Sequence, residues 1–283
     1  MLAFQLQPID YLIIGHLTRD LTPSGPRLGG TAAYAALTAR ALGLRVGVLT
    51  AASADLDLAP LGDLLVVVQS SPQTTTYENV PLGDGRRKQL IHACASRLDL
   101  KLIPEPWRRV PIVHFGPVAD ELHPVLPPFL NFTLLGLTPQ GWMRSWGADG
   151  EVRHKRWEAP EALVSQAGAV VISVEDVDGD EDEIDRLAHL IPILVVTEGA
   201  AGARLYWHGD QRRFRAPRRR EVDATGAGDI FAAAFFTRLY VTRDPWEAAR
   251  FATALASCSV TRPGLEGVPT PAEIEASLME VLP

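Results

Sequence analysis

The chain has 283 residues, of which 47% are hydrophobic and 22% are charged, and its formal net charge at pH 7 is −7. Such a composition is ordinary for a globular protein and predicts one large α/β domain over residues 1–283. The negative charge argues against a nucleic-acid partner, and no apolar run approaches the roughly 20 residues of a membrane span.

The chain has two cysteines, Cys94 and Cys258, which lie far apart in the sequence. They have no metal-ligand spacing, so buried free thiols in a reducing compartment are expected. The N-terminal residues do not show a basic segment followed by an apolar core and a cleavage site. We therefore expect a cytoplasmic protein.

Short apolar runs alternate with helical stretches along the chain. Strands are predicted at 9–15, 45–51, 64–68, 112–115, 132–135, 169–174 and 193–197, with a helix at 29–43. Continuous apolar strands between helices are typical of a mostly parallel sheet covered by helices on both faces. The run 64–68 is expected to be a buried strand of that sheet.

Two segments break this alternation, and each reads as a β-hairpin. Residues 74–80 and 87–93 flank the glycine-rich turn 81–85, and residues 203–207 and 211–215 flank the turn 208–210. The last predicted elements are helices at 246–261 and 271–282.

The run Asp223-Ala224-Thr225-Gly226-Ala227-Gly228-Asp229 opens an apolar helix. Small residues at a helix N-terminus leave backbone N–H groups uncovered, and such an end attracts anions. Asp229 then has two interpretations. It either stabilises the helix start, or it accepts a proton from a hydroxyl that attacks a phosphate.

A second motif, Gly29-Gly30-Thr31-Ala32-Ala33-Tyr34, opens a helix near the N-terminus. The two motifs and the order of elements between them resemble the ribokinase-like (PfkB) carbohydrate kinases over nearly the whole chain. The resemblance implies an α/β fold of three layers (α/β/α) with a mostly parallel central sheet and a small β lid. It also implies an ATP-dependent kinase that phosphorylates a hydroxyl of a sugar or cyclitol.

The resemblance implies roles for the residues of the acceptor and transfer sites. Asp229 is expected to be the general base, and the amides of Gly226, Ala227 and Gly228 form the anion hole for the transferred phosphate. On the acceptor side, Asp20 would accept hydrogen bonds from vicinal hydroxyls, close to Gly29 and Gly30. Tyr34 stands where most sugar kinases of the family have Asn, so its ring is expected to stack against an apolar face of a different acceptor.

The resemblance also implies nucleotide and cation contacts. Thr197 and Gly199 match a turn that lines the nucleotide, and Thr225 and Thr253 are expected to contact it too. Glu175 and Asp176 are the candidate carboxylates for Mg²⁺, although the Asn of the family's pattern is missing. Asp223 could hold a monovalent cation such as K⁺.

Three further features bear on the site. Only about a dozen residues separate His16 from Gly29, so a reduced lid built chiefly from residues 74–93 is expected. The basic stretch 212–220 is either a solvated surface or a source of positive potential for a nucleotide. Arg144 either reaches a phosphate or lies on the surface.

Other functions are also compatible with parts of this sequence pattern. A nucleoside or pyrimidine-alcohol kinase of the same fold, or a catalytically weak ligand-binding homologue, are the alternatives. The sequence has neither Gly-x-Gly-x-x-Gly after the first strand nor Gly-x-x-x-x-Gly-Lys-Ser/Thr, which argues against a dinucleotide oxidoreductase and a P-loop kinase. The expected partners are a sugar or cyclitol and ATP, for a monomer or homodimer.

Overall fold

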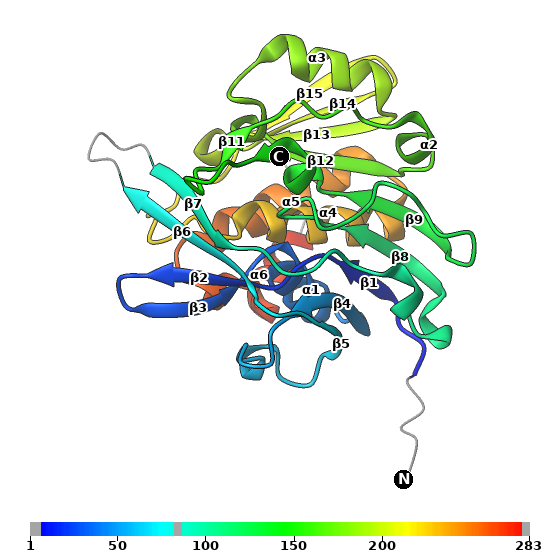
Figure 1. The fold of residues 1–283 in the computed structure, drawn as a ribbon. Coiled ribbons are helices and arrows are strands. Elements are labelled where there is room, and N and C mark those ends of the chain that lie inside the picture. Colours follow the sequence, from blue (N-terminus) through cyan, green and yellow to red (C-terminus); the bar gives the residue numbers. More distant parts are fainter. Residues whose placement is uncertain (1–6, 82–86, 279–283) are drawn as a thin grey trace.

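The computed structural model describes residues 7–81 and 87–278 (Figure 1). Its centre is a sheet in the order β15-β14-β13-β12-β9-β8-β1-β4-β5. The seven strands from β13 to β5 are parallel, and β14 and β15 add an antiparallel hairpin at one edge. These strands are β1 (Tyr11–Ile14), β4 (Val46–Ala52), β5 (Leu65–Ser70), β8 (Arg109–Phe115), β9 (Asn131–Leu137), β12 (Ala169–Ser173), β13 (Ile193–Thr197), β14 (Ala203–Trp207) and β15 (Asp210–Phe214).

The sheet is buried on both faces because successive side chains of a strand point in opposite directions. Tyr11 and Ile13 of β1 pack into one apolar core with α1 (Thr31–Ala41), α4 (Ala227–Thr242) and α5 (Pro245–Ser259). Leu12 and Ile14 pack into a second core with α2 (Glu161–Val164) and α3 (Glu181–Leu190). The expected three-layer α/β/α architecture with a mostly parallel sheet is confirmed (Figure 1).

The remaining elements are short. They are α6 (Pro271–Leu278), a two-strand ribbon of β10 (Arg144–Ser145) and β11 (Arg153–His154), and seven 3₁₀ turns: η1 (Ala59–Leu61), η2 (Leu100–Leu102), η3 (Glu105–Trp107), η4 (Pro139–Met143), η5 (Val174–Val177), η6 (Gly199–Ala201) and η7 (Gly264–Gly267). Within 7–81 and 87–278, no helix is long and apolar enough to cross a membrane.

A second sheet forms the lid, in the order β3-β2-β6-β7. Its strands are β2 (Thr18–Thr22), β3 (Gly25–Gly29), β6 (Thr75–Pro81) and β7 (Arg87–Ala93). The hairpin predicted at 74–93 is confirmed, although residues 82–86 of its turn lie outside the described residues. Residues 75–81 and 87–93 supply the two longer strands of the lid, but residues 18–29 contribute two further strands, more than the sequence predicted. The dozen residues after His16 suffice for two five-residue strands because only Pro23 and Ser24 connect them.

Two burial expectations also need correction. β5 is half-buried rather than buried, because it is the last strand of the sheet and has a neighbour on one side only. Cys94 and Cys258 are both free, but each is partly exposed rather than buried.

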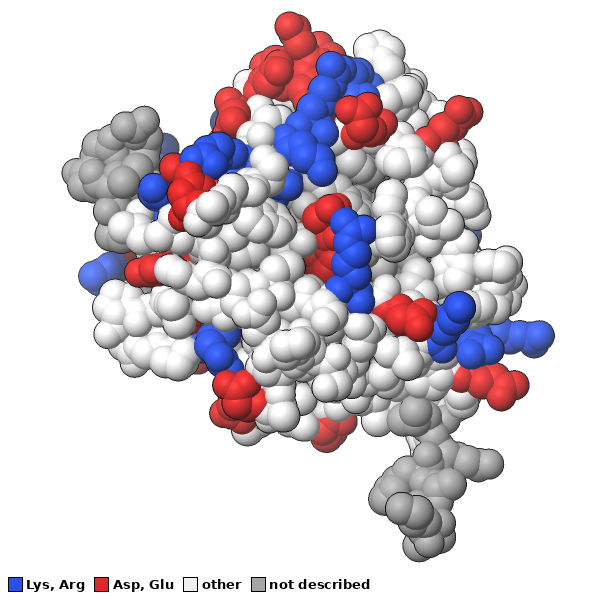
Figure 2. Space-filling view, viewed as in Figure 1, with Lys and Arg blue, Asp and Glu red and all other residues white. Residues whose placement is uncertain are grey.

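Charged side chains of both signs are spread over the face in Figure 2, with wide uncharged areas between them. The acidic residues at the top of that view lie over α3, whose first turn holds Glu181, Asp182 and Glu183. No continuous basic surface is seen on this face, which agrees with the net charge of −7.

Candidate active site

Helix α4 begins at a turn that leaves backbone donors open. Gly226 is the residue before the helix, with φ of +79°, and no side chain caps this end. Among the described residues, none accepts a hydrogen bond from the amides of Gly226 and Gly228. The Ala227 amide instead donates to the Ala224 carbonyl at 3.2 Å. The open donors and the helix dipole make this turn a site for an anion, but Ala227 has a partner of its own and is a weaker member than the sequence suggested.

Asp229 lies in the first turn of α4 and joins the two sequence motifs. Its Oδ1 accepts a hydrogen bond of 2.7 Å from the hydroxyl of Thr31, the first residue of α1. Removal from water raises the pKa of the Asp229 carboxyl to about 6, against the lowering effects of the Thr31 hydrogen bond and the Arg144 charge. A half-buried carboxylate with this pKa, beside open amides, has the properties of a general base.

Thr31 is a site residue that the sequence reasoning missed. It is 2% exposed and lines the same cleft as Asp229. Its position directly after Gly29-Gly30 could have indicated this role, because the first residue of a helix lies beside the glycines that precede it.

Asp20 lies on β2 of the lid and faces the same cleft as Asp229. Its Oδ1 accepts a 2.7 Å hydrogen bond from the Thr18 hydroxyl, and burial raises the pKa of the carboxyl. Gly29 lies directly beside it. A Cβ at Gly29 would come within 2.1 Å of Asp20 Oδ2. Gly29 is therefore needed for the position of this carboxylate, and it does not itself line the cleft as Gly30 does.

Tyr34 packs against the anion-binding turn. A Cβ at Gly226 would lie 2.3 Å from two carbons of the Tyr34 ring, and Tyr34 is only 3% exposed. The ring also lines the cleft close to Asp20. The Tyr34 ring therefore packs against the turn and supports it, in addition to any contact with an acceptor.

The acceptor half of the cleft is polar. Arg144 lies there, half-buried, with its guanidinium 5.6 Å from the ring centre of Tyr77. Its Nη1 donates a hydrogen bond to the Val118 carbonyl at 3.3 Å. A guanidinium has five N–H donors, so others remain for a ligand. The inner face of the lid adds Asn79 and Gln89, which are hydrogen-bonded to each other at 3.1 Å.

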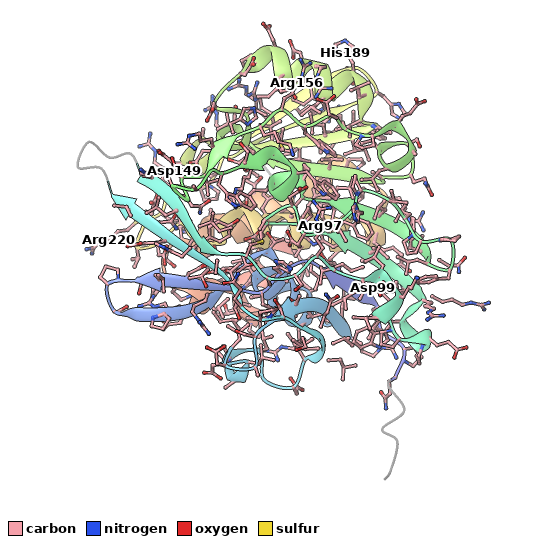
Figure 3. All side chains as sticks on the ribbon, viewed as in Figure 1. Arg97, Asp99, Asp149, Arg156, His189 and Arg220 are labelled. Carbon is pink, nitrogen blue, oxygen red and sulfur yellow. The ribbon has the colours of Figure 1, made fainter. Side chains whose placement is uncertain are left out.

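The other half of the cleft extends past Gly228 towards α5. Thr197, Gly199, Thr225 and Thr253, the residues expected from the sequence to contact a nucleotide, all line it. Arg218 and Arg219 of the basic stretch also line it, which favours a local positive potential over a purely solvated surface there. Arg220, labelled in Figure 3, lies at the margin of the molecule on the side of the lid strands.

The candidate cation ligands have partners within the protein. Asp176 caps η5: its Oδ2 accepts the Ser173 amide at 2.8 Å and its Oδ1 accepts the Gln140 side chain at 3.0 Å. Glu175 lines the cleft. Both Asp223 oxygens accept backbone amides at 2.9 Å, from Thr225 and Gly264. Across the described ranges, no group of three or more His, Cys, Asp or Glu side chains could hold a metal ion.

A model of the "pfkB family carbohydrate kinase" matches residues 160–272, which include the second motif. The chain carries a pfkB family region in a ribokinase fold. The fold is seen in a "pyrophosphate-dependent kinase in the ribokinase family" bound to a pyrophosphate analogue and myo-inositol (TM-score 0.74, 22% identity, 95% of this chain and 100% of that one). It is also seen in Arabidopsis thaliana ribokinase with ribose and ATP (TM-score 0.69, 16% identity, covering 97% of this chain and 100% of that one).

The chain is also similar to curated proteins. A probable fructokinase-5 of Arabidopsis thaliana is 29% identical over 150 residues, covering 45% of this chain and 46% of the relative. An inositol 3-kinase of Oryza sativa subsp. japonica is 38% identical over 77 residues, covering 27% of this chain and 19% of the relative. The matches thus span less than half the length of either relative. The resemblance inferred from the two motifs is confirmed.

Proposed function

We propose that the protein is a kinase that transfers the γ-phosphate of ATP to a hydroxyl of a sugar or cyclitol. The observation that carries this proposal is one cleft with Asp229, open amides at Gly226 and Gly228, and Asp20 facing it from the lid. The fructokinase and inositol kinase among the relatives support the same class. A ligand-binding protein without catalysis would not need a half-buried carboxylate beside an anion-binding turn.

In this mechanism the acceptor hydroxyl lies between Asp20 and Asp229. Asp229 removes its proton while the hydroxyl oxygen forms a bond to the γ-phosphorus. The bond from that phosphorus to the bridging oxygen breaks, and ADP leaves with the bond's electrons. The amides of Gly226 and Gly228 stabilise the charge on the transferred group, and the lid strands exclude water, which would otherwise compete as acceptor.

Mg²⁺ fits this site as an ion held mainly by phosphate oxygens and water, because Asp176 is tied to Ser173 and Gln140 and only Glu175 faces the cleft. When bound, it would neutralise charge on the phosphates. Asp223 would take part in a K⁺ site only if it gave up at least one of its two backbone hydrogen bonds.

The acceptor half favours a compound rich in hydroxyl groups. Asp20 offers carboxylate acceptors, while Asn79, Gln89 and Arg144 offer amide and guanidinium groups. Such groups hydrogen-bond to vicinal hydroxyls, so a sugar or cyclitol is preferred over a nucleoside. The test is a coupled ADP-release assay against sugars, cyclitols and nucleosides, with and without K⁺. Acceptor-dependent release with a polyol supports the proposal, and stimulation by nucleosides alone would replace it with the nucleoside kinase.

Asp20→Asn is expected to raise the acceptor KM by about tenfold or more, since it replaces a charged acceptor of two hydroxyl hydrogen bonds with a neutral amide. The substitution is nearly isosteric, so Gly29 keeps its neighbour. The KM for ATP should stay within about twofold. Steady-state kinetics with each substrate varied in turn measure both constants. An equal rise in the two KM values would show that Asp20 supports the fold of the lid instead of binding the acceptor.

The pH dependence should follow the ionisation of Asp229. A base acts only when deprotonated, so kcat/KM should fall by about tenfold per pH unit below pH 6. The Arg144 charge lowers the pKa of Asp229, so Arg144→Gln should move this acid limb to higher pH. Arg144→Lys, which keeps the charge, is the matched control. An acid limb at the same pH in Arg144→Gln and the wild type would contradict the assignment of Asp229 as base.

A further inference from the structure

The far half of the cleft, beyond the anion-binding turn, has walls of small and apolar residues. The cavity as a whole measures about 500 Å³ and continues from the acceptor side to the surface of α5. The residues that line this far half and carry no charge are Thr197, Gly199, Ala200, Gly202, Ala216, Pro217, Thr225, Thr253, Ala256, Ser257 and Val260. Such walls suit a flat apolar surface such as a nucleobase and would leave a donor made only of phosphate without contacts there.

The two hydroxyls that α5 contributes to this wall already donate hydrogen bonds to helix carbonyls. Thr253 donates to the Ala249 carbonyl and Ser257 donates to the Ala254 carbonyl, each at 2.7 Å. Both residues belong to α5 and are almost fully buried, at 4% and 7% exposed. Each hydroxyl therefore offers the cleft at most a hydrogen-bond acceptor.

An acceptor alone does not separate the nucleobases. Adenine and cytosine carry an amino group, guanine carries ring and amino N–H groups, and uracil carries a ring N–H, so each can donate to such an oxygen. A side chain discriminates between bases when it both donates to and accepts from one base edge, as Asn and Gln do for adenine. No Asn or Gln is found among the described residues of this half.

The charged residues of this half can contact parts of a nucleotide other than the edge of its base. Arg218 and Arg219 are exposed where they line the cleft. A guanidinium attracts phosphate and stacks on the face of any base, so its contacts do not depend on the base edge. Glu221, the third charged residue of residues 215–226 that lines the cleft, is also exposed and would remain solvated.

Resting on the proposed kinase function, we propose that the donor site accepts purine and pyrimidine nucleoside triphosphates with little discrimination between bases. The donor is held by its phosphates at the turn of α4, by apolar contact with the walls formed by α5 and residues 199–202, and by the two arginines. The base edge contributes little to affinity.

The test compares kcat/KM for ATP, GTP, CTP and UTP at a saturating acceptor, together with thermal protection by ADP, GDP, CDP and UDP. The four triphosphates should lie within about tenfold of one another, and the four diphosphates should raise Tm by similar amounts. A preference of more than tenfold for one base, or pyrophosphate as the best donor, would overturn the inference and leave the kinase in place. Failure of every donor to give a phosphorylated acceptor would instead overturn the kinase proposal, and the diphosphate series would still test base tolerance.

Thr253→Asn adds a side chain that can read a base edge, so it should change the ATP-to-UTP ratio of kcat/KM by about tenfold while the acceptor KM stays within about twofold. Thr242→Asn is the matched control, because Thr242 also donates to a helix carbonyl, that of Arg238, but lies outside the cleft. Its ratio should equal that of the wild type. An unchanged ratio in Thr253→Asn would show that Thr253 does not face the base and would overturn this assignment.

Discussion

Asp229→Asn is expected to lower kcat by about 10²- to 10⁴-fold, the usual contribution of a general base. The amide keeps the shape of the side chain and its hydrogen bond with Thr31, but it cannot take the proton of the acceptor hydroxyl. Binding of ATP and acceptor should survive, because the open amides of Gly226 and Gly228 and the Asp20 carboxylate remain. Single-turnover kinetics and calorimetric binding, run on the same preparation, separate the two effects.

The stability of the same variant provides its control. The pKa of Asp229 rises from 3.8 to about 6 on folding, so the ionised carboxylate is disfavoured in the folded protein. This cost is absent below pH 3.8, grows as the pH rises through 6, and is fully present at pH 7. Asp229→Asn removes the charge, so Tm at pH 7 should equal or exceed that of the wild type. Near-normal turnover in a stable variant would show that Asp229 only stabilises the start of the helix and is not the general base.

Gly226→Ala is expected to lower kcat by about 10²-fold, because the new Cβ would lie 2.3 Å from the Tyr34 ring and would push the anion-binding turn out of place. The left-handed φ of +79° adds a backbone cost of roughly 1–2 kcal/mol for any residue with a Cβ. The acceptor KM should change less than kcat, since Asp20 lies on the lid. Steady-state kinetics and thermal unfolding measure the two effects.

Two variants separate the clash from the backbone cost. Gly43→Ala carries the same kind of positive φ, +88°, with nothing within 4 Å of the new Cβ, so it should lose stability and keep its activity. Gly226→Ala in a Tyr34→Leu background should cost less kcat than Gly226→Ala alone, as expected for residues in contact. Additive losses in this cycle would mean that Tyr34 does not support the turn.

Much of the fold was readable from the sequence because local patterns determined it. The parallel strands were continuous apolar runs, and the run from Asp223 to Asp229 combined turn residues with the start of a buried helix. The lid strands β2 and β3 were not readable, since Thr18–Thr22 and Gly25–Gly29 contain charged residues and a proline and have no apolar alternation. Their strand conformation depends on pairing with each other and with β6, which is information from outside the segment.

The sequence predicted which residues form the site better than it predicted the contacts between them. The two glycine motifs indicated which residues meet, and Asp20 and Asp229 indeed line one cleft. The hydrogen bond from Thr31 to Asp229 and the packing of Tyr34 on Gly226 join residues about 190 positions apart, and no local pattern encodes such contacts. The cation ligands were hardest, because Asp176 and Asp223 look like free carboxylates in the sequence and are hydrogen-bonded in the fold.

Several predictions from the sequence stay predictions. A single domain over residues 1–283, a cytoplasmic location, a monomer or homodimer, and a response to K⁺ each need an experiment of their own. The lid bears on the oligomeric state, since β3 is an outer strand of the four-stranded sheet with a paired strand on one side only, whereas the outer side of β7 bonds residues 150–152. Light scattering on the purified protein answers that question directly.

The central claim is that a phosphate moves from a nucleotide to a hydroxyl at Asp229. ³¹P NMR of a reaction with Mg-ATP and the best polyol of the acceptor panel tests it most directly. The account predicts a phosphomonoester resonance that grows in step with ADP and is missing in Asp229→Asn. ADP accompanied only by inorganic phosphate, or a phosphomonoester formed equally fast by Asp229→Asn, would contradict it.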